Sequence, residues 1–232
     1  MLQNKYNRQI LVIKHGALGD IVQALDAFAS LRAGNPQARI ALMTSPGFLS
    51  LAKMMPWFDE VIADPRAGLL NLVAAWRIRQ SFRQDWSMIV DMQCSSRTRK
   101  YFAHFVPSNT RWIGIASGCS DPLPNFTGVN NRDRMSISVK MAGGISQSPD
   151  MSWLVNGAAQ TDDLAVMISD KYYEVLIPGC SLAKLQKRCP ADRFAATGNE
   201  LVSRGFEIVL VGTADDRDAV NAVLAASPDA ID

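Results

Sequence analysis

The sequence predicts an α/β protein with parallel sheets, and three observations support this class. Short apolar segments rich in Ile, Val and Leu alternate along the chain with amphipathic segments. Glycine, proline and asparagine separate the segments at short intervals, as in repeated strand–helix units. Several apolar segments are continuous, which is typical of strands buried on both faces of a parallel sheet. We therefore expect doubly wound parallel sheets with helices on both faces.

The composition is that of a globular protein with a sizeable core. The 232 residues are 48% hydrophobic and 20% charged, and the formal net charge of +2 is too small to indicate a nucleic-acid partner. No apolar run has the length of a membrane span, and residues 1–8 lack the apolar core of a signal peptide, so we expect a cytoplasmic location. The four cysteines form no Cys-x-x-Cys pair, which argues against a zinc site or a disulfide framework.

The first domain is predicted from five strand segments and the helices between them. The strands are expected at 10–13, 38–44, 60–63, 87–92 and 111–115. The helices are expected at 21–31, 46–55, 69–82, 97–105 and 134–143. Residues 116–133 lose apolar periodicity, and so long a loop in a compact domain is usually functional or mobile. The five tryptophans are expected to pack in the core or at domain edges.

A second α/β pattern follows. Strands are expected at 172–177 and 206–212, and helices at 190–204 and 215–226, the first of which starts with Pro190 and ends before Gly205. Two strands with their helices cannot cover a parallel sheet on both faces, so we expect this domain to be incomplete. The predicted organisation is a first domain at 1–157, a connection at 158–171 and a partial second domain at 172–232.

A glycine-rich turn ending in an acid follows the first strand. Gly16 and Gly19 are expected to take positive φ and to let the backbone approach a ligand, and Asp20 falls where a helix would begin. The carboxyl edge of an open α/β sheet is where such folds bind ligands. Alternatively, Asp20 is only an N-cap. Dinucleotide binding is disfavoured, because the three-glycine fingerprint is absent.

Polar side chains also follow the fourth predicted strand. Asp91, Gln93 and Arg97 suggest recognition of hydroxyl or phosphate groups. Alternatively, Ser95 or the next serine caps the helix, and the arginines lie on its solvated face. His15 has no evident partner in the sequence, so a catalytic triad is not supported.

A basic segment follows the first strand of the second domain. Gly179 and Ser181 supply exposed backbone, and Lys187 and Arg188 follow within ten residues. Backbone N–H groups and cations of this kind can hold a diphosphate without a metal. A solvated basic loop is the alternative on spacing alone.

Taken together, these stretches resemble glycosyltransferase family 9, which includes the ADP-heptose:lipopolysaccharide heptosyltransferases. The resemblance is carried by three segments along nearly the whole chain. They are Ile-Leu-Val-Ile-Lys with Gly-Ala-Leu-Gly-Asp at 10–20, Asp-Met-Gln at 91–93, and Ile-Pro-Gly at 177–179 with Lys-Arg-Cys-Pro at 187–190.

The resemblance implies a GT-B enzyme with two Rossmann-like domains, the acceptor on the first and a nucleotide-sugar donor mainly on the second. It implies inverting, metal-independent transfer without a cofactor. By this match Asp20 is the general base, kept ionised by the start of its helix, and Lys187 stabilises the leaving diphosphate with support from Arg188. The implied reaction moves a heptose-type sugar from an ADP-heptose-like donor to a lipopolysaccharide core or similar glycolipid. This activity is compatible with peripheral contact at the cytoplasmic face of the inner membrane.

The family's later Asp-Ser/Thr-Gly-x-x-His motif does not occur in this sequence, so we expect a C-terminally truncated chain whose own activity stays open. A non-catalytic assembly module with a truncated GT-B fold is therefore an alternative function. A nucleotide-sugar epimerase or dehydrogenase is a third hypothesis, and it requires a dinucleotide.

Overall fold

The computed structural model describes residues 8–66, 71–157, 172–180, 182–227 and 230–231. The chain divides into two compact units, Met1–Ala158 and Ala159–Asp232, and each is described here by itself. The predicted connection at 158–171 lies outside the described residues.

The first unit is built on a parallel sheet of six strands in the order β3-β2-β1-β4-β5-β6. The strands are β1 (Gln9–Ile13), β2 (Arg39–Thr44), β3 (Glu60–Ala63), β4 (Met88–Asp91), β5 (Arg111–Gly114) and β6 (Asp121–Pro122). The parallel α/β class and the five predicted strands are thus confirmed. The central strand β1 pairs with β2 and β4, and its last four residues are buried.

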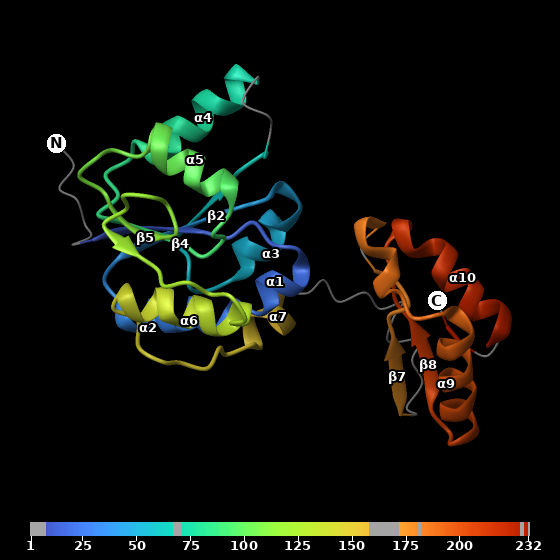
Figure 1. Cartoon of the computed structure of the whole chain (residues 1–232). Helices are drawn as coiled ribbons and strands as arrows, with labels where there is room; N and C mark the ends of the chain where they lie inside the picture. The colour runs from blue at the N-terminus through green and yellow to red at the C-terminus, as the bar shows by residue number, and fades with distance from the viewer. Residues whose placement is uncertain (1–7, 67–70, 158–171, 181, 228–229, 232) are drawn as a thin grey trace. The chain divides into compact units, whose positions relative to one another are not determined.

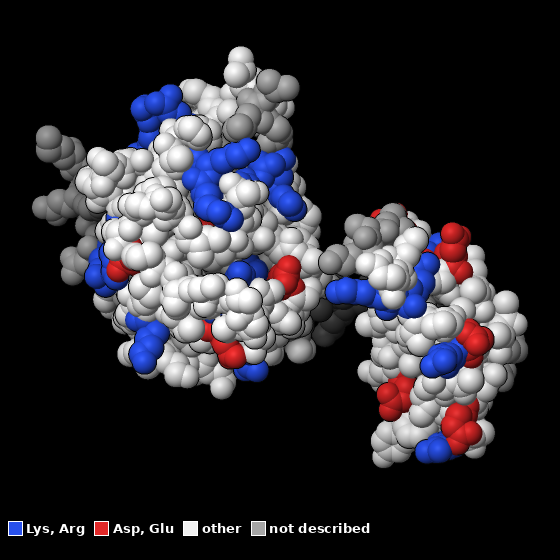
Figure 2. Space-filling view, in the orientation of Figure 1, with Lys and Arg blue, Asp and Glu red and all other residues white. Residues whose placement is uncertain are grey.

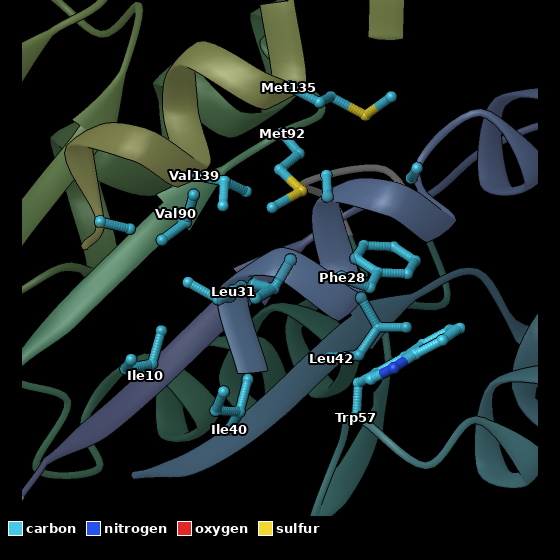
Figure 3. Close-up of a cluster of buried hydrophobic side chains, with 14 of the residues drawn as sticks. Ile10, Phe28, Leu31, Ile40, Leu42, Trp57, Val90, Met92, Met135 and Val139 are labelled. Atoms are coloured by element: carbon cyan, nitrogen blue, oxygen red, sulfur yellow. The ribbon is translucent and has the colours of Figure 1, made fainter. Parts of the chain in front are cut away.

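Helices cover both faces of this sheet (Figure 1). On one face lie α1 (Leu18–Val22), α2 (Leu25–Gly34), α3 (Leu49–Met54), α6 (Asn131–Met141) and α7 (Ser152–Gly157). On the other lie α4 (Leu72–Phe82) and α5 (Ser96–Phe105). Figure 3 shows the first layer, where Phe28 and Leu31 of α2 and Val139 of α6 pack onto strand residues such as Leu42 and Val90. Pro46–Phe48 forms a 3-10 turn before α3.

Two details of the first unit differ from the sequence-based expectation. The predicted helix at 21–31 is two helices, because the chain turns at residues 23–24 between α1 and α2. The predicted loop at 116–133 contains β6, which the Arg111 guanidinium holds by two hydrogen bonds to Asp121. It also contains the first turn of α6, whose N-cap Asn130 accepts a hydrogen bond from the Asp133 N–H.

Four of the five tryptophans pack as expected. Trp57, Trp86 and Trp112 are buried, and Trp153 of α7 packs edge-on against Trp57. Trp76 on α4 is 60% exposed, so the prediction that it packs in the core or at a domain edge is wrong. The helix turns Ile78 and Phe82 toward the sheet, and at a period of 3.6 residues Trp76 then falls on the outward side.

The second unit contains a two-stranded parallel sheet of β7 (Tyr173–Leu176) and β8 (Glu207–Leu210). Its helices are α9 (Ala191–Ser203) and α10 (Arg217–Ala226), with 3-10 turns at Leu182–Lys187 and Ala214–Asp216. The predicted helix ends of α9 are confirmed, since Pro190 is the N-cap and Gly205 takes a φ of +89°. No helix among the described residues combines the length and apolarity that crossing a membrane requires.

Candidate functional site

The two glycines after β1 have different roles. Gly16 takes a φ of +70°, as predicted, and a Cβ there would lie 2.7 Å from the Ile21 side chain. Gly19 is helical, and a Cβ there would meet nothing within 4 Å, so the prediction of positive φ at Gly19 is wrong. Gly16 therefore shapes the turn, whereas Gly19 leaves open space at the start of α1.

Gln93 fixes this turn from the neighbouring strand. Its side-chain oxygen accepts hydrogen bonds from the backbone N–H groups of His15 (3.0 Å) and Gly16 (3.4 Å). Asp91 is fully buried and accepts from the N–H groups of Gln93 (3.1 Å) and Cys94 (2.8 Å). Burial raises the pKa of Asp91 to about 6. Both residues hold backbone in place, and the Asp91 carboxylate is closed to solvent.

Asp20 lies in the first turn of α1 with its carboxylate partly exposed. The N-cap of α1 is Ala17, so the alternative that Asp20 caps the helix is wrong. Asp20 Oδ1 accepts a hydrogen bond of 3.1 Å from Asn131 Nδ2 at the start of α6. The second carboxylate oxygen has no hydrogen-bond donor among the described residues and is available to a substrate hydroxyl.

Two cations lie near Asp20 that sequence reasoning did not single out. Lys14 is only 1% exposed, and burial lowers its pKa, while the charge of Asp20 opposes this shift. Arg134 lies one turn into α6, close enough to lower the Lys14 pKa as well. The Arg134 Nε is buried and has no hydrogen-bond partner in the described part of the chain. The site thus combines one carboxylate with a guanidinium whose Nε has no partner among the described residues.

A cavity of about 690 Å³ opens beside Arg134. Its wall is formed by Cys94, by Arg134 and by the segment from Ile115 to Thr127, which is most of the predicted functional loop. The wall is apolar at Leu123 and Phe126 and polar at Asn125. The Cys94 thiol is not a reactive group here, because burial raises its pKa to about 12. The cavity can hold a polar ligand with an anionic group directed at Arg134.

His15 has a partner that the sequence did not reveal. Its Nε2 lies 2.8 Å from Asp64 Oδ2, and both side chains are buried. The Tyr101 hydroxyl donates to the same oxygen at 2.7 Å. Hydrogen bonds from His15 and Tyr101 hold the pKa of Asp64 below its usual value against the opposing effect of burial. This closed network stabilises the carboxyl edge of the sheet.

Arg97 belongs to the same network. Its guanidinium donates to the Tyr101 hydroxyl (3.2 Å) and to the backbone oxygen of Arg66 (2.9 Å). Ser95 forms a capping box with Thr98, which confirms the helix-capping alternative for this segment. The observed contacts of Arg97 are structural, and its assignment to substrate binding stays a prediction.

In the second unit, Gly179 lies so close to the Asp216 side chain that no other residue fits there without a shift. A Cβ at this position would lie 2.2 Å from Asp216 Cγ. The Asp216 carboxylate accepts hydrogen bonds from the backbone and side chain of Thr213, at 3.1 and 2.7 Å, which lower its pKa. A backbone hydrogen bond from Cys180 and the charge of Arg188 act in the same direction. Sequence reasoning missed Asp216, which ties the Gly179 turn to the segment before α10.

Lys187 and Arg188 differ in their surroundings. Lys187 ends the 3-10 turn and is exposed. Arg188 lies 3.7 Å from Asp216 Oδ1, but its Nε and Nη2 are buried without a hydrogen-bond partner in the described ranges. Arg188 also lines a cavity of about 330 Å³ with Pro178 and Asp218. Ser181 lies outside the described residues.

The predicted site residues therefore form two groups, one in each unit. Gly16, Gly19 and Asp20 meet Asn131 of α6 at one edge of the large sheet, and Gln93 holds their turn. Gly179 and Arg188 meet at Asp216 in the second unit. Asn131 and Arg134 could have been found from the sequence only by their position at the end of the aperiodic loop at 116–133.

Comparison with known sequences identifies relatives along most of the chain, although no family model matches it. The chain is 26% identical to lipopolysaccharide heptosyltransferase 2 of Salmonella typhimurium and 25% identical to that of Escherichia coli. Each match covers 94% of this chain and 67% of the relative.

Comparison with solved structures supports the same assignment at the level of the fold. A glycosyl transferase of family 9 from Veillonella parvula matches 95% of this chain and 67% of its own, with a TM-score of 0.74 at 16% identity. E. coli ADP-heptose lps heptosyltransferase II matches 96% of this chain and 71% of its own, with a TM-score of 0.66 at 18% identity. The chain is thus a relative of the lipopolysaccharide heptosyltransferases and shares the GT-B fold of the family 9 glycosyltransferases.

Proposed function

We propose that this chain transfers a heptose-type sugar from a nucleotide-diphosphate donor, such as an ADP-heptose-like compound, to a lipopolysaccharide core or similar glycolipid. The transfer inverts the anomeric centre and uses protein cations instead of a metal. The names of the relatives and of a solved E. coli heptosyltransferase with an ADP-heptose analogue support the donor and acceptor classes. Contact with the cytoplasmic face of the inner membrane is part of the proposal, because a glycolipid acceptor is anchored there.

The observation that carries the proposal is the position of Asp20. Its carboxylate lies at the carboxyl edge of the central strand, oriented by Asn131 at 3.1 Å and with one oxygen left for a substrate. Such a carboxylate can accept the proton of an acceptor hydroxyl. Arg134, whose Nε has no partner in the part of the chain that the structure describes, and the adjoining cavity of about 690 Å³ suit an acceptor that carries a negative group.

The second unit offers the chemistry needed for the donor. The exposed ammonium of Lys187 and the partly unsatisfied guanidinium of Arg188 follow the Gly179 turn. Cations placed where charge develops lower the barrier to departure of a diphosphate. We assign Lys187 to the leaving phosphate, and Arg188, Gly179 and Ser181 to binding of the donor.

The proposed step is a single displacement. The acceptor hydroxyl gives its proton to Asp20 as its oxygen forms a bond to the anomeric carbon of the sugar. The bond from that carbon to the diphosphate oxygen breaks, and the nucleoside diphosphate leaves with the electron pair. Lys187 stabilises the negative charge that develops on this leaving group. Attack from the side opposite the leaving group inverts the anomeric centre.

The test compares two carboxylates in similar settings. Asp20→Asn in the 232-residue chain is expected to lower transfer from ADP-heptose to heptose-deficient lipopolysaccharide by about 10²–10⁴-fold, with ADP binding unchanged. Asp26→Asn is the matched control, because Asp26 also contacts α6, through Arg132. Loss of ADP binding in Asp20→Asn makes Asp20 structural. Absence of transfer by the unaltered chain contradicts the proposal.

A non-catalytic assembly module is the second candidate, and the outer face of β7 favours it. Tyr173 and Val175 of this strand and Ile177, directly after it, alternate with other residues and are 49%, 45% and 62% exposed. Exposed apolar surface of this kind often marks an interface. Light scattering separates the two: a dispersed monomer that transfers sugar excludes obligate assembly, whereas a stable oligomer without transfer supports the module.

A further inference from the structure

The outward side of α4 exposes large apolar side chains where the sequence predicts a buried face. Leu72, Val73 and Trp76 are 78%, 63% and 60% exposed. They lie on one side of the first turns of the helix, while Ile78 and Phe82 face the core. Leu72, Val73 and Trp76 therefore form one continuous apolar patch at the start of α4, which we call the apolar tip.

Cations surround this tip, and neither of the two helices on this face contains an acid. α4 and α5 pack side by side, with the rings of Phe82 and Tyr101 centred 5.4 Å apart. The sequences of both helices contain no Asp or Glu. Their exposed cations, with the C-cap residue of α4, are Arg77, Arg79, Arg83, Arg99 and Lys100. Lysine and arginine side chains gather over this part of the first unit in Figure 2.

These cations are available to a partner. Within the described ranges no carboxylate lies within 4 Å of Arg77, Arg79 or Lys100. The acids closest to them in sequence are Asp85, which follows α4, and Asp91, which is fully buried. The positive charge of this surface is therefore not neutralised within the unit.

We propose that α4 and α5 form a docking surface for a membrane that contains anionic phospholipid. Leu72, Val73 and Trp76 would enter the interfacial layer, and the five cations would contact lipid phosphates. Tryptophan favours this layer because its ring is apolar and its N–H is polar. The binding of an amphipathic helix grows with its buried apolar area and with its attraction to anionic lipid, and α4 supplies both.

This docking surface extends the proposed function. It rests on the proposed function in one respect, because a glycolipid acceptor would place the chain at a membrane. A protein partner with an acidic face would satisfy the cations, but an exposed Trp beside aliphatic residues at the tip of a basic helix fits a lipid interface better. Each cation near an anionic bilayer contributes about fivefold to partitioning, so several together give binding that depends on salt.

The experiment is co-sedimentation of the 232-residue chain with vesicles. We expect binding to mixed phosphatidylcholine–phosphatidylglycerol vesicles, weak binding to phosphatidylcholine alone, and a loss of binding at high salt. Arg77→Glu with Arg79→Glu is expected to weaken binding by at least about 25-fold, which is two cations at about fivefold each. Lys53→Glu with Lys140→Glu, two exposed cations on helices of the opposite face, is the matched control and is expected to bind normally.

The apolar tip has its own test. Val73→Ser is expected to weaken vesicle binding, whereas Val155→Ser, at a valine of α7 that is 76% exposed, is not. The tryptophan fluorescence of the chain should shift to shorter wavelength with anionic vesicles, and Trp76→Phe should remove the shift. Thermal unfolding of each variant verifies that it is folded.

No binding to anionic vesicles, or equal binding to both vesicle types, overturns the proposal, as does equal weakening by the control variants. Sugar transfer to a soluble, delipidated acceptor is measured as well, because it tests the proposed function without a membrane. The α4 variants should retain that transfer, and a chain without any transfer can still bind vesicles through this surface.

Discussion

Asn131 Nδ2 donates a 3.1 Å hydrogen bond to Asp20 Oδ1 and so connects the start of α6 to the first turn of α1. The two residues are 111 positions apart in the sequence. The bond fixes one carboxylate oxygen and so directs the other. Orientation of a catalytic base by a second group is a recurrent feature of enzyme sites.

Asn131→Ala is therefore expected to slow transfer about tenfold, the equivalent of one hydrogen bond, with the donor KM unchanged. Asn131→Asp places a second negative charge beside Asp20, so the acidic limb of the pH–rate profile should move to higher pH. Steady-state kinetics across pH measures both effects. Ser136→Ala, at an exposed position of α6, is the control and should leave the profile unchanged. An unchanged rate in Asn131→Ala would show that this contact does not orient the base.

Asp91 gives a prediction about stability. Burial raises its pKa from 3.8 to about 6, so the folded chain holds this proton more tightly than the unfolded chain. Stability from this group is thus present at low pH and is lost as pH rises through about 6. The loss corresponds to about 3 kcal/mol.

The measurement for Asp91 is urea unfolding of the chain and of Asp91→Asn at several pH values. The free energy of unfolding of the unaltered chain, relative to the variant, should fall by about 3 kcal/mol between about pH 4 and about pH 7. Subtraction of the variant removes contributions from groups such as Asp64, whose lowered pKa acts in the opposite direction. A difference that does not change with pH contradicts the buried-carboxylate explanation.

The sheet of the first unit was predictable because its strands are short apolar runs that must be buried, and pattern alone locates them. The break between α1 and α2 was not, because both segments have suitable apolar residues and no proline marks the turn. Gly16 was predicted correctly, since a positive φ favours glycine. Gly19 shows that a second glycine in such a motif need not take that conformation.

The polar contacts of the site were less predictable. Asp64 and His15 are 49 positions apart, and Gly179 and Asp216 are 37 apart, so no local pattern pairs them. The exposed Trp76 reverses the usual inference from apolar periodicity, because an apolar stripe has the same appearance whether it faces a core or another surface. Only the direction of Ile78 and Phe82 decides between these possibilities.

The buried network around Asp64 predicts a second pH-dependent effect. Tyr101→Phe removes the 2.7 Å hydrogen bond to Asp64 Oδ2 but keeps the ring that packs on Phe82. We expect a loss of stability of about 1–3 kcal/mol at neutral pH, because a buried carboxylate loses a donor. The pKa of Asp64 is lowered in the folded chain, so this stabilisation is present above about pH 4 and is lost as the carboxyl protonates.

Thermal unfolding at neutral and acidic pH checks this expectation. The difference between the unaltered chain and Tyr101→Phe should shrink in acid. Tyr172→Phe, at a residue that is 83% exposed, is the control for loss of a hydroxyl group and should be neutral. An equal loss of stability at both pH values would mean that the hydroxyl contributes independently of the charge on Asp64, for example through the hydrogen bond that it accepts from Arg97.

The two glycines Gly19 and Gly179 should respond in opposite ways to alanine. A Cβ at Gly19 meets open space in a helical turn, and alanine is the better helix former there, so Gly19→Ala should leave the stability of the first unit unchanged or slightly raised. A Cβ at Gly179 would lie 2.2 Å from Asp216 Cγ, so the turn or the carboxylate must move. Gly179→Ala should then displace Asp216 from Thr213 and loosen the start of α10.

Hydrogen exchange localises both effects, because it reports on each unit separately. In Gly179→Ala, the amides of α10 should exchange about tenfold faster or more, in line with the cost of overpacking, while those of β1 remain as before. ADP affinity should fall in the same variant if the Gly179 turn contacts the donor, and should be unchanged in Gly19→Ala. Normal exchange of α10 with weakened ADP binding would show that the added methyl group blocks the ligand directly, without displacing Asp216.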